Sequence, residues 1–260
     1  MRNLSTFQDI LRLLDDGLKE ELEQKSISDL TLDFGSDLVV VLFSDGSLIF
    51  FSIVDGFKLC DFNFNRENLG EAVWFSVQYV GELRAIIAIS KSGEINEISC
   101  ISDYENNLHR GLPKVYTCEE VGVVDGGIES ASWSPDVGTL AIISGNNTLM
   151  LMKSNWEDVT EIMLPNRVPN STCSLAWIGD GTLLAVMTLD ASDKIYRVRL
   201  YSRLLEVENI ARKVPKSGQD AGLIVGLEPC MAWSPNCTIL ACAFRKPPGA
   251  MHVCFLIHIP

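Results

Sequence analysis

The segment at residues 130–152, S-A-S-W-S-P-D-V-G-T-L-A-I-I-S-G-N-N-T-L-M-L-M, contains a tryptophan, a Ser-Pro-Asp turn and two apolar runs separated by Gly-Asn-Asn. Proline after serine presets a turn and the adjacent aspartate can hydrogen-bond its own backbone, so we expect the chain to reverse directly after Trp133. The runs at residues 140–143 and 149–152 predict two short buried strands, because Gly and Asn between them accept positive φ angles. The segment therefore predicts consecutive β-hairpins.

The same phrase occurs twice more, as S-L-A-W-I-G-D-G-T-L-L-A-V-M-T at residues 174–188 and C-M-A-W-S-P-N-C-T-I-L-A-C-A-F at residues 230–244. Fainter copies begin at Ala72 and Leu30. The leucine after the turn marks each copy, and the five markers are Leu38, Leu83, Leu140, Leu184 and Leu240, spaced 45, 57, 44 and 56 residues apart. Repeats of roughly 40–45 residues with four strands each are typical of propeller blades, and longer loops account for the wider spacings. The repeat predicts an all-β, WD-repeat-like β-propeller.

Two parts of the chain are expected. Residues 1–29 form an N-terminal segment, which is either an amphipathic helix lying on the propeller or a strand that closes the ring, and residues 30–260 form the blades. The helical spacing runs over Leu4, Phe7, Leu11, Leu14, Leu18 and Leu22. The chain stops inside the apolar run C-F-L-I-H-I-P, so we expect an incomplete propeller with an open or strained closure.

The tryptophans are expected to be structural. Trp74, Trp133, Trp177 and Trp233 are interpreted as occupying one repeat position, which predicts that they pack between neighbouring blades and do not form a stacking surface for a ligand.

Composition and charge indicate a folded domain inside the cell. The 260 residues are 47% hydrophobic and 21% charged, no apolar run approaches the roughly 18 residues that span a bilayer, and the start lacks a signal-peptide core. The formal net charge of −13 repels phosphate backbones and argues against nucleic-acid binding by this chain.

One basic segment, K-I-Y-R-V-R-L-Y-S-R at residues 194–203, departs from this balance. In a strand, Arg197, Arg199 and Tyr201 would share a face. A solvated outer strand is favoured over an RNA groove, because Glu206 and Glu208 follow closely.

Motifs that carry chemistry are not found. The sequence contains neither a glycine-rich phosphate loop, nor H-E-x-x-H, nor G-x-S-x-G, so we assign no catalytic residue, no cofactor and no enzymatic activity. Asp45 and Asp180 are interpreted as turn residues. The eight cysteines contain no C-x-x-C pair and are expected to be free thiols. His252 and Cys254 alternate on one strand, but two ligands do not make a site and no metal is assigned.

Four segments of this sequence resemble segments of the Elongator complex subunit 1 family, also called the IKAP family. They are G-G-I-E-S-A-S-W-S-P-D-V-G-T-L-A-I-I-S-G-N-N-T-L-M-L-M at residues 126–152, L-A-W-I-G-D-G-T-L-L-A-V from Leu175, K-I-Y-R-V-R-L-Y from Lys194, and G-L-E-P-C-M-A-W-S-P-N-C-T-I-L-A from Gly226. The order agrees with the family's, and the opening Met-Arg-Asn-Leu is similar as well.

The resemblance implies a non-catalytic scaffold that acts in the cytoplasm, and also in the nucleus, in tRNA wobble-uridine modification. Its partners would be the catalytic subunit 3 and the propeller subunit 2 of Elongator, with tRNA contacted through the whole complex, homodimerisation through regions absent from this chain, and no membrane. The alternative hypothesis is a propeller of a vesicle coat or another membrane-trafficking scaffold, where similar divergent blades occur.

Overall fold

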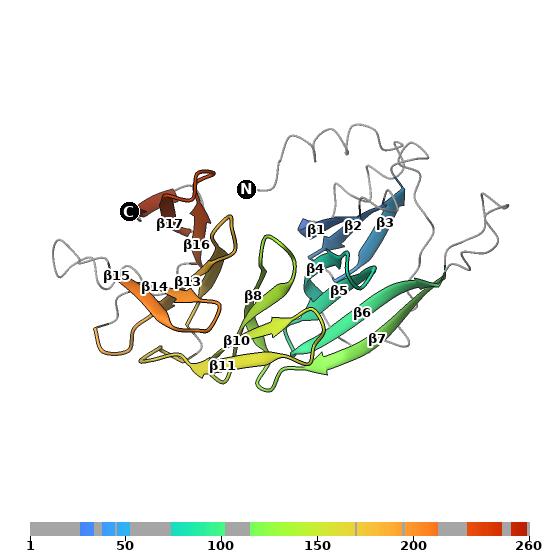
Figure 1. Ribbon diagram of the computed structural model, residues 1–260, viewed down its shortest axis with the longest axis horizontal. Helices are drawn as coiled ribbons and strands as arrows, with labels where there is room; N and C mark the ends of the chain where they lie inside the picture. Colours follow the sequence, from blue (N-terminus) through green and yellow to red (C-terminus); the bar gives the residue numbers. More distant parts are fainter. Residues whose placement is uncertain are drawn as a thin grey trace. The chain divides into compact units, whose positions relative to one another are not determined.

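Every regular element in the described part of the chain is a β-strand, which confirms the all-β prediction (Figure 1). The computed structural model describes residues 27–33, 38–44, 46–52, 74–101, 115–169, 171–193, 196–212, 228–245 and 251–258. Within these residues there is no helix that is long and apolar enough to cross a membrane. The helix or closing strand predicted before residue 27 lies outside the described residues and stays a prediction, as does the closure of the ring.

The chain divides into two compact units, residues 1–124 and 125–260. In the first unit, one sheet has the order β1-β2-β3 and the next has the order β4-β5-β6-β7. The strands are β1 (Ile27–Asp33), β2 (Leu38–Phe43), β3 (Leu48–Ser52), β4 (Trp74–Val80), β5 (Ala85–Ser90), β6 (Glu94–Ile101) and β7 (Val115–Val123).

The second unit contains three sheets, with the orders β8-β9-β10-β11, β12-β13-β14-β15 and β16-β17-β18. The strands are β8 (Ile128–Trp133), β9 (Thr139–Ser144), β10 (Thr148–Lys153), β11 (Val159–Met163), β12 (Ser174–Trp177), β13 (Leu183–Leu189), β14 (Tyr196–Ser202), β15 (Val207–Arg212), β16 (Glu228–Trp233), β17 (Ile239–Arg245) and β18 (Met251–His258). In all five sheets, strands that are consecutive in sequence pair antiparallel, as in propeller blades.

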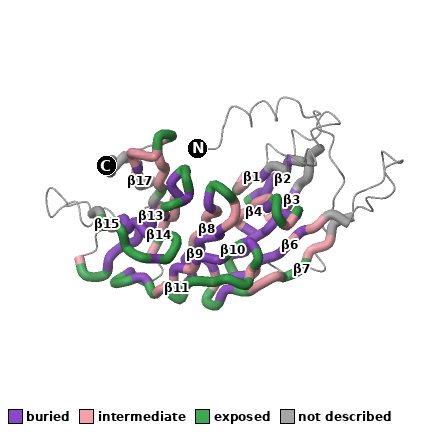
Figure 2. The backbone as a smooth tube through the Cα atoms, viewed as in Figure 1, coloured by how far each residue is buried: buried purple, intermediate pink, exposed green. Residues whose placement is uncertain are grey.

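The second strand of a sheet is deeply buried, because other parts of the chain cover both faces of the sheet at this position. All six residues of β5 and all six of β9 are buried, whereas the turns are exposed, as the purple and green segments of Figure 2 show. Strands buried on both faces read as continuous apolar runs in the sequence, which explains why A-I-I-A-I-S and T-L-A-I-I-S show little alternation.

The repeated phrase forms the hairpin that its turn residues predict. Trp133 pairs with Leu140, and the equivalent pairs in the next two sheets are Trp177 with Leu184 and Trp233 with Leu240. In the first of these turns, Ser134 Oγ accepts a hydrogen bond from Thr139 N at 3.0 Å and donates one to Asp136 Oδ1 at 2.5 Å.

The residue after the Asp or Asn of each turn has a left-handed backbone conformation. The φ angles are 58° at Val137, 71° at Gly181 and 60° at Cys237. The geometry is thus a property of the repeat, although only one of the three positions has the glycine that this conformation favours.

Two assignments in the fainter second copy are wrong. Trp74 pairs with Ser90 at the start of β4, whereas Val80 pairs with Ala85 at the position that Trp133 and Leu140 occupy in the next sheet. Leu83 therefore lies in the β4–β5 turn and not in a strand. The copy lacks the Ser-Pro-Asp turn, so the leucine after its tryptophan does not mark the same position.

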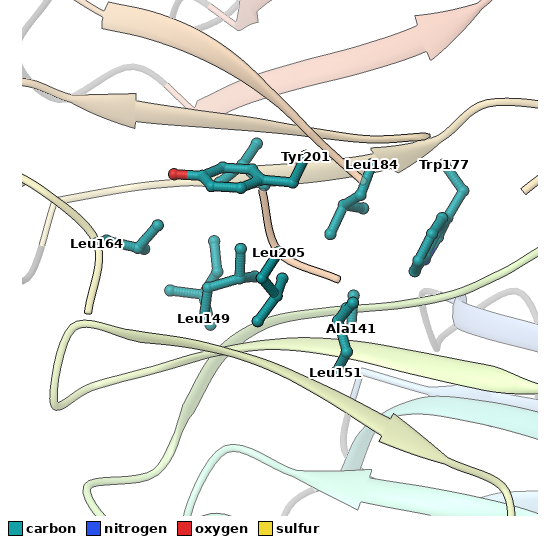
Figure 3. Packing of buried hydrophobic residues seen from close by; sticks show 10 residues of the cluster. Ala141, Leu149, Leu151, Leu164, Trp177, Leu184, Tyr201 and Leu205 are labelled. Atoms are coloured by element: carbon teal, nitrogen blue, oxygen red, sulfur yellow. The ribbon is translucent and has the colours of Figure 1, made fainter. Parts of the chain in front are cut away.

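Side chains from neighbouring sheets of the second unit pack together. One cluster joins Ala141, Leu149 and Leu151 of one sheet to Leu184 and Tyr201 of the next, and Figure 3 shows these side chains. Trp177 belongs to this cluster, and Trp233 packs against the cluster between the last two sheets. The predicted packing of tryptophan between neighbouring sheets is confirmed at these two positions and also at Trp74, which packs with residues of β2 and β3.

Candidate functional site

The most distinctive polar feature of the described chain is a buried carboxylate at the end of β13. Asp190 follows β13, a strand that is apolar except for Thr188, and its side chain is completely buried. Its Oδ1 accepts hydrogen bonds from Ser192 N at 3.0 Å and Ser192 Oγ at 2.5 Å. Its Oδ2 pairs with the guanidinium groups of Arg197 and Arg199, the second at 3.3 Å.

The two arginines reach Asp190 because β14 runs back beside β13. Arg197 lies opposite Thr188 and Arg199 lies opposite Val186, so both side chains share a face of the sheet near Asp190. Arg199 Nη1 also donates to Thr188 Oγ1 at 3.1 Å, and Arg197 Nη2 binds Asp193 at 2.6 Å. We refer to Asp190, Ser192, Asp193, Arg197 and Arg199 as the Asp190 cluster.

The prediction that residues 194–203 form a solvated outer strand is therefore wrong. β14 is the third strand of four, Arg199 is 5% exposed, and Tyr201 is fully buried. The prediction that these three residues share a face is confirmed. An RNA groove gains no support either, because the cluster's two cations lie against two carboxylates.

The pKa of Asp190 is set by its burial, its hydrogen bonds and the two nearby arginines. Burial alone would raise the pKa of this carboxyl, but hydrogen bonds from Ser192 and the positive charges of Arg197 and Arg199 outweigh it and hold the pKa below its ordinary value. Asp190 is thus ionised at neutral pH and compensates the buried guanidinium of Arg199.

A second ion pair involves a buried arginine in the connection between β11 and β12. The side chain of Arg167 is fully buried, pairs with Glu129 of β8, and donates to Ser171 O at 2.7 Å. Its backbone forms an isolated antiparallel bridge with Asp190. Burial lowers the pKa of Arg167 from its ordinary value. Arg167 therefore joins the start of one sheet to the connection that leads into the next.

A third ionic contact lies at the other end of β14, in the turn that leads to β15. Arg203, in the β14–β15 turn, pairs with Asp136 at 2.8 Å and donates to Gly181 O at 2.7 Å. The guanidinium carbon lies 5.7 Å from the centre of the Trp177 ring. Arg203 thus connects the Ser-Pro-Asp turn of one sheet to the equivalent turn of the next.

Two of the described thiols, those of Cys118 and Cys173, are poorly suited to nucleophilic chemistry. Burial raises the pKa of Cys118 and of Cys173 to about 11, so both are protonated at neutral pH. Cys118, Cys173, Cys230 and Cys237 are free, as predicted for these four. The side chains of Cys60, Cys100 and Cys254, and those of all three histidines, lie outside the described residues.

Asp180 has the predicted turn role, since its Oδ1 accepts from Thr182 N at 2.9 Å and Thr182 Oγ1 at 2.7 Å. Asp45 is outside the described residues. Among the residues whose side chains are described, no group of three or more His, Cys, Asp and Glu could hold a metal ion. The polar clusters can therefore hold loops and sheets in register, and their charged groups are largely used by one another.

The pairing of Arg167 with Glu129 was not anticipated, because no local pattern relates residues 38 positions apart. Asp190 has a weak local signal that sequence reasoning did not use. An acidic residue directly after L-L-A-V-M-T-L stands at the end of a strand that is buried on both faces.

The comparison with protein families agrees with this arrangement of repeated antiparallel sheets. Residues 1–171 match the family described as ELP1 first N-terminal beta-propeller. The chain belongs to this family. Residues 131–215 also match the anaphase-promoting complex subunit 4 WD40 domain.

Curated relatives agree with membership of the ELP1 first-propeller family. The chain is 24% identical to Elongator complex protein 1 of Rattus norvegicus, with 50% of this chain and 12% of that protein aligned. It is 23% identical to Elongator complex protein 1 of Oryctolagus cuniculus, with 58% of this chain and 14% of that protein aligned. The chain therefore spans only a small part of the length of these relatives.

Solved structures support the fold of the family. The β-propeller domain of Cps50 (Swd1) from Myceliophteria thermophila aligns with a TM-score of 0.54 and 11% identity, covering 90% of this chain and 73% of that one. A chain of the Mitotic Checkpoint Complex crystal structure aligns with the same TM-score and 12% identity, covering 88% of this chain and 60% of that one. The fold is a β-propeller, as the repeat predicts.

Proposed function

We propose that this chain is a non-catalytic scaffold portion of an Elongator subunit 1, which supports assembly with the catalytic and propeller subunits for tRNA wobble-uridine modification. The observation that carries the proposal is the match of residues 1–171 to the ELP1 first propeller, together with the Elongator complex protein 1 relatives. The expected site of action is the cytoplasm and also the nucleus.

The chemistry of the described residues is consistent with a scaffold. Asp190 and Arg167, which are buried and charged, are each paired within the second unit, and the thiols of Cys118 and Cys173 are protonated at neutral pH. A scaffold needs rigid sheets and accessible loops, whereas an enzyme needs a group whose pKa suits proton transfer or nucleophilic attack.

The test is co-purification of the full 260-residue chain with tagged Elongator catalytic subunit 3, with and without propeller subunit 2. The proposal expects the chain to be retained on the tagged subunit and to be absent when an unrelated tagged propeller replaces it. Failure of the folded chain to associate with either subunit contradicts the proposal.

Binding to tRNA gives a second measurement. Because the chain carries a formal charge of −13, we expect weak binding at low salt and none at physiological salt, with tRNA bound through the whole complex. Tight binding of the isolated chain that resists salt would contradict this part of the proposal.

A further inference from the structure

Among the described strands, β15, the outer strand of the sheet β12-β13-β14-β15, has one edge without a partner strand. β15 pairs with β14 on one side, and none of the described strands pairs with its other side (Figure 1). An edge of this kind presents unpaired backbone N–H and C=O groups that can pair with an added strand.

Exposed apolar side chains lie on β15 and on the turn that precedes it. Leu204 is 75% exposed, Val207 49% and Ile210 56%, so three large apolar residues within seven positions face solvent. We call these three residues the β15 apolar edge. Single exposed apolar residues are ordinary on a protein surface, but a group on one hairpin is a feature of binding surfaces.

A β-bulge brings two of the three onto one face of the sheet. Val207 lies opposite Tyr201 and Ile210 lies opposite Arg199, with a register shift between them. Residues that lie directly opposite share a face, so Val207 and Ile210 project on the same side although they are three positions apart. In a regular strand they would project on opposite sides.

The charge beside the apolar edge is negative. Glu206 and Glu208 are exposed, and neither forms an ion pair within the described part of the chain. The nearby cation Arg203 is occupied by Asp136 and Gly181 O. Described side chains from Leu204 to Ile210 are therefore apolar, acidic or amide, with no positive charge among them.

We propose that β15 docks an extended segment of another protein in which lysine or arginine alternates with apolar residues. The segment would add a strand beside β15, place its apolar side chains against Val207 and Ile210, and set its cations near Glu206 and Glu208. Self-association through the edges of two β15 strands is the alternative, and the experiment below distinguishes it. The inference does not depend on the proposed Elongator role.

The probe is a fluorescein-labelled peptide in which Lys alternates with Val, titrated with the full chain and followed by fluorescence anisotropy. Two peptide controls use the unaltered protein: one has Glu in place of Lys, and the other carries N-methyl groups on alternate backbone amides, which cannot donate to a neighbouring strand. We expect binding of the Lys-Val peptide only, weakening as salt is raised.

Variants of the chain locate the contact. The double change Glu206→Lys and Glu208→Lys, and separately Ile210→Ser, should each weaken binding about ten-fold or more. Glu161→Lys is the control, because it makes one such Glu→Lys replacement at an exposed position on β11, the edge strand of the preceding sheet, and should leave binding unchanged. Thermal melting checks that each variant is folded.

Four results would overturn the proposal: no measurable binding of the Lys-Val peptide, equal binding of the N-methylated peptide, an equal effect of Glu161→Lys, or self-association of the chain through β15. The peptide controls do not require any variant to fold, so the proposal can fail even if the variants are unstable.

Discussion

The indole Nε1 of Trp233 donates a hydrogen bond to the backbone carbonyl of Ala176, 3.1 Å away. One sheet earlier, Trp177 Nε1 makes the same contact with Ser132 O at 3.0 Å. Each acceptor directly precedes the tryptophan of the preceding sheet. The sequence repeat in the second unit is therefore also a repeat of hydrogen bonding between the first strands of adjacent sheets.

Replacement of Trp177 should be costly because this side chain is 8% exposed and fills the space between two sheets. We expect Trp177→Ala to lower the free energy of unfolding by roughly 3–5 kcal/mol, through lost burial and a residual cavity. Trp177→Phe should cost about 1–3 kcal/mol, since the Ser132 carbonyl loses its donor. Urea denaturation measures both.

Trp156→Phe is the control, because the indole N–H of Trp156 has no hydrogen-bond partner among the described residues. If Trp156→Phe lowers the free energy of unfolding as much as Trp177→Phe does, the hydrogen bond to Ser132 O does not have the proposed role.

Trp133→Ala should destabilise the chain less than Trp177→Ala. Trp133 is half-buried, and its ring meets that of Trp156 edge-on at 6.2 Å. Thermal melting measures the difference. If Trp133→Ala retains full stability but abolishes association with Elongator subunits, normalised to folded protein, then Trp133 is a contact residue and its structural interpretation is wrong.

Val137→Gly should stabilise the chain. A branched residue at φ 58° carries steric strain of about 1–2 kcal/mol, which glycine removes at an entropic cost of roughly 0.5–1 kcal/mol. A higher melting temperature is expected. The converse change, Gly181→Val, should lower it, because a branched side chain at φ 71° is strained and its Cβ would also displace Arg203 Nη2, 2.5 Å away. Destabilisation by Val137→Gly would show that the valine side chain contributes more through packing than it costs through strain.

Stability should fall in acid through Asp136. The hydrogen bond from Ser134, with further help from Arg203 and Gly138 N, lowers the pKa of this carboxyl from 3.8 to about 2. Because the folded pKa is the lower one, the stabilisation is complete above the unfolded value and disappears as pH falls through the folded value. The free energy of unfolding should therefore decrease between about pH 4 and pH 2.

Asp136→Asn tests this assignment, since Asn236 occupies the equivalent place in a later turn and accepts from Ser234 Oγ at 2.7 Å. The variant should show a shallower loss of stability over the same pH range. An unchanged pH profile would assign the acid sensitivity to other carboxyl groups.

Asp190→Asn should destabilise the second unit strongly, by roughly 3–5 kcal/mol, because the buried guanidinium of Arg199 loses its charge partner. Asp193→Asn removes the other carboxylate from Arg197 at a more exposed position and should cost about 1 kcal/mol or less. Guanidinium chloride denaturation compares the two. Equal effects would contradict the view that burial sets the difference.

The sequence by itself determined the all-β class, the repeat and three of its turns, because tight turns and their flanking strands depend on residues that are close along the chain. Ser134, Pro135 and Asp136 are sufficient to predict a hairpin between Trp133 and Leu140, and the same logic holds around Asp180 and Asn236. The logic failed at Trp74 and Leu83, where this turn chemistry is absent and spacing alone misplaced the register.

Only the tertiary structure decided the roles of the charged residues. Arg197 and Arg199 alternate like residues of a solvated strand. Their burial depends on the position of β14 between β13 and β15 and on the carboxylate of Asp190. Arg167 and Glu129 meet only because two sheets pack side by side. Burial and ion pairing depend on contacts between residues far apart along the chain, and a single sequence carries no local pattern that specifies them.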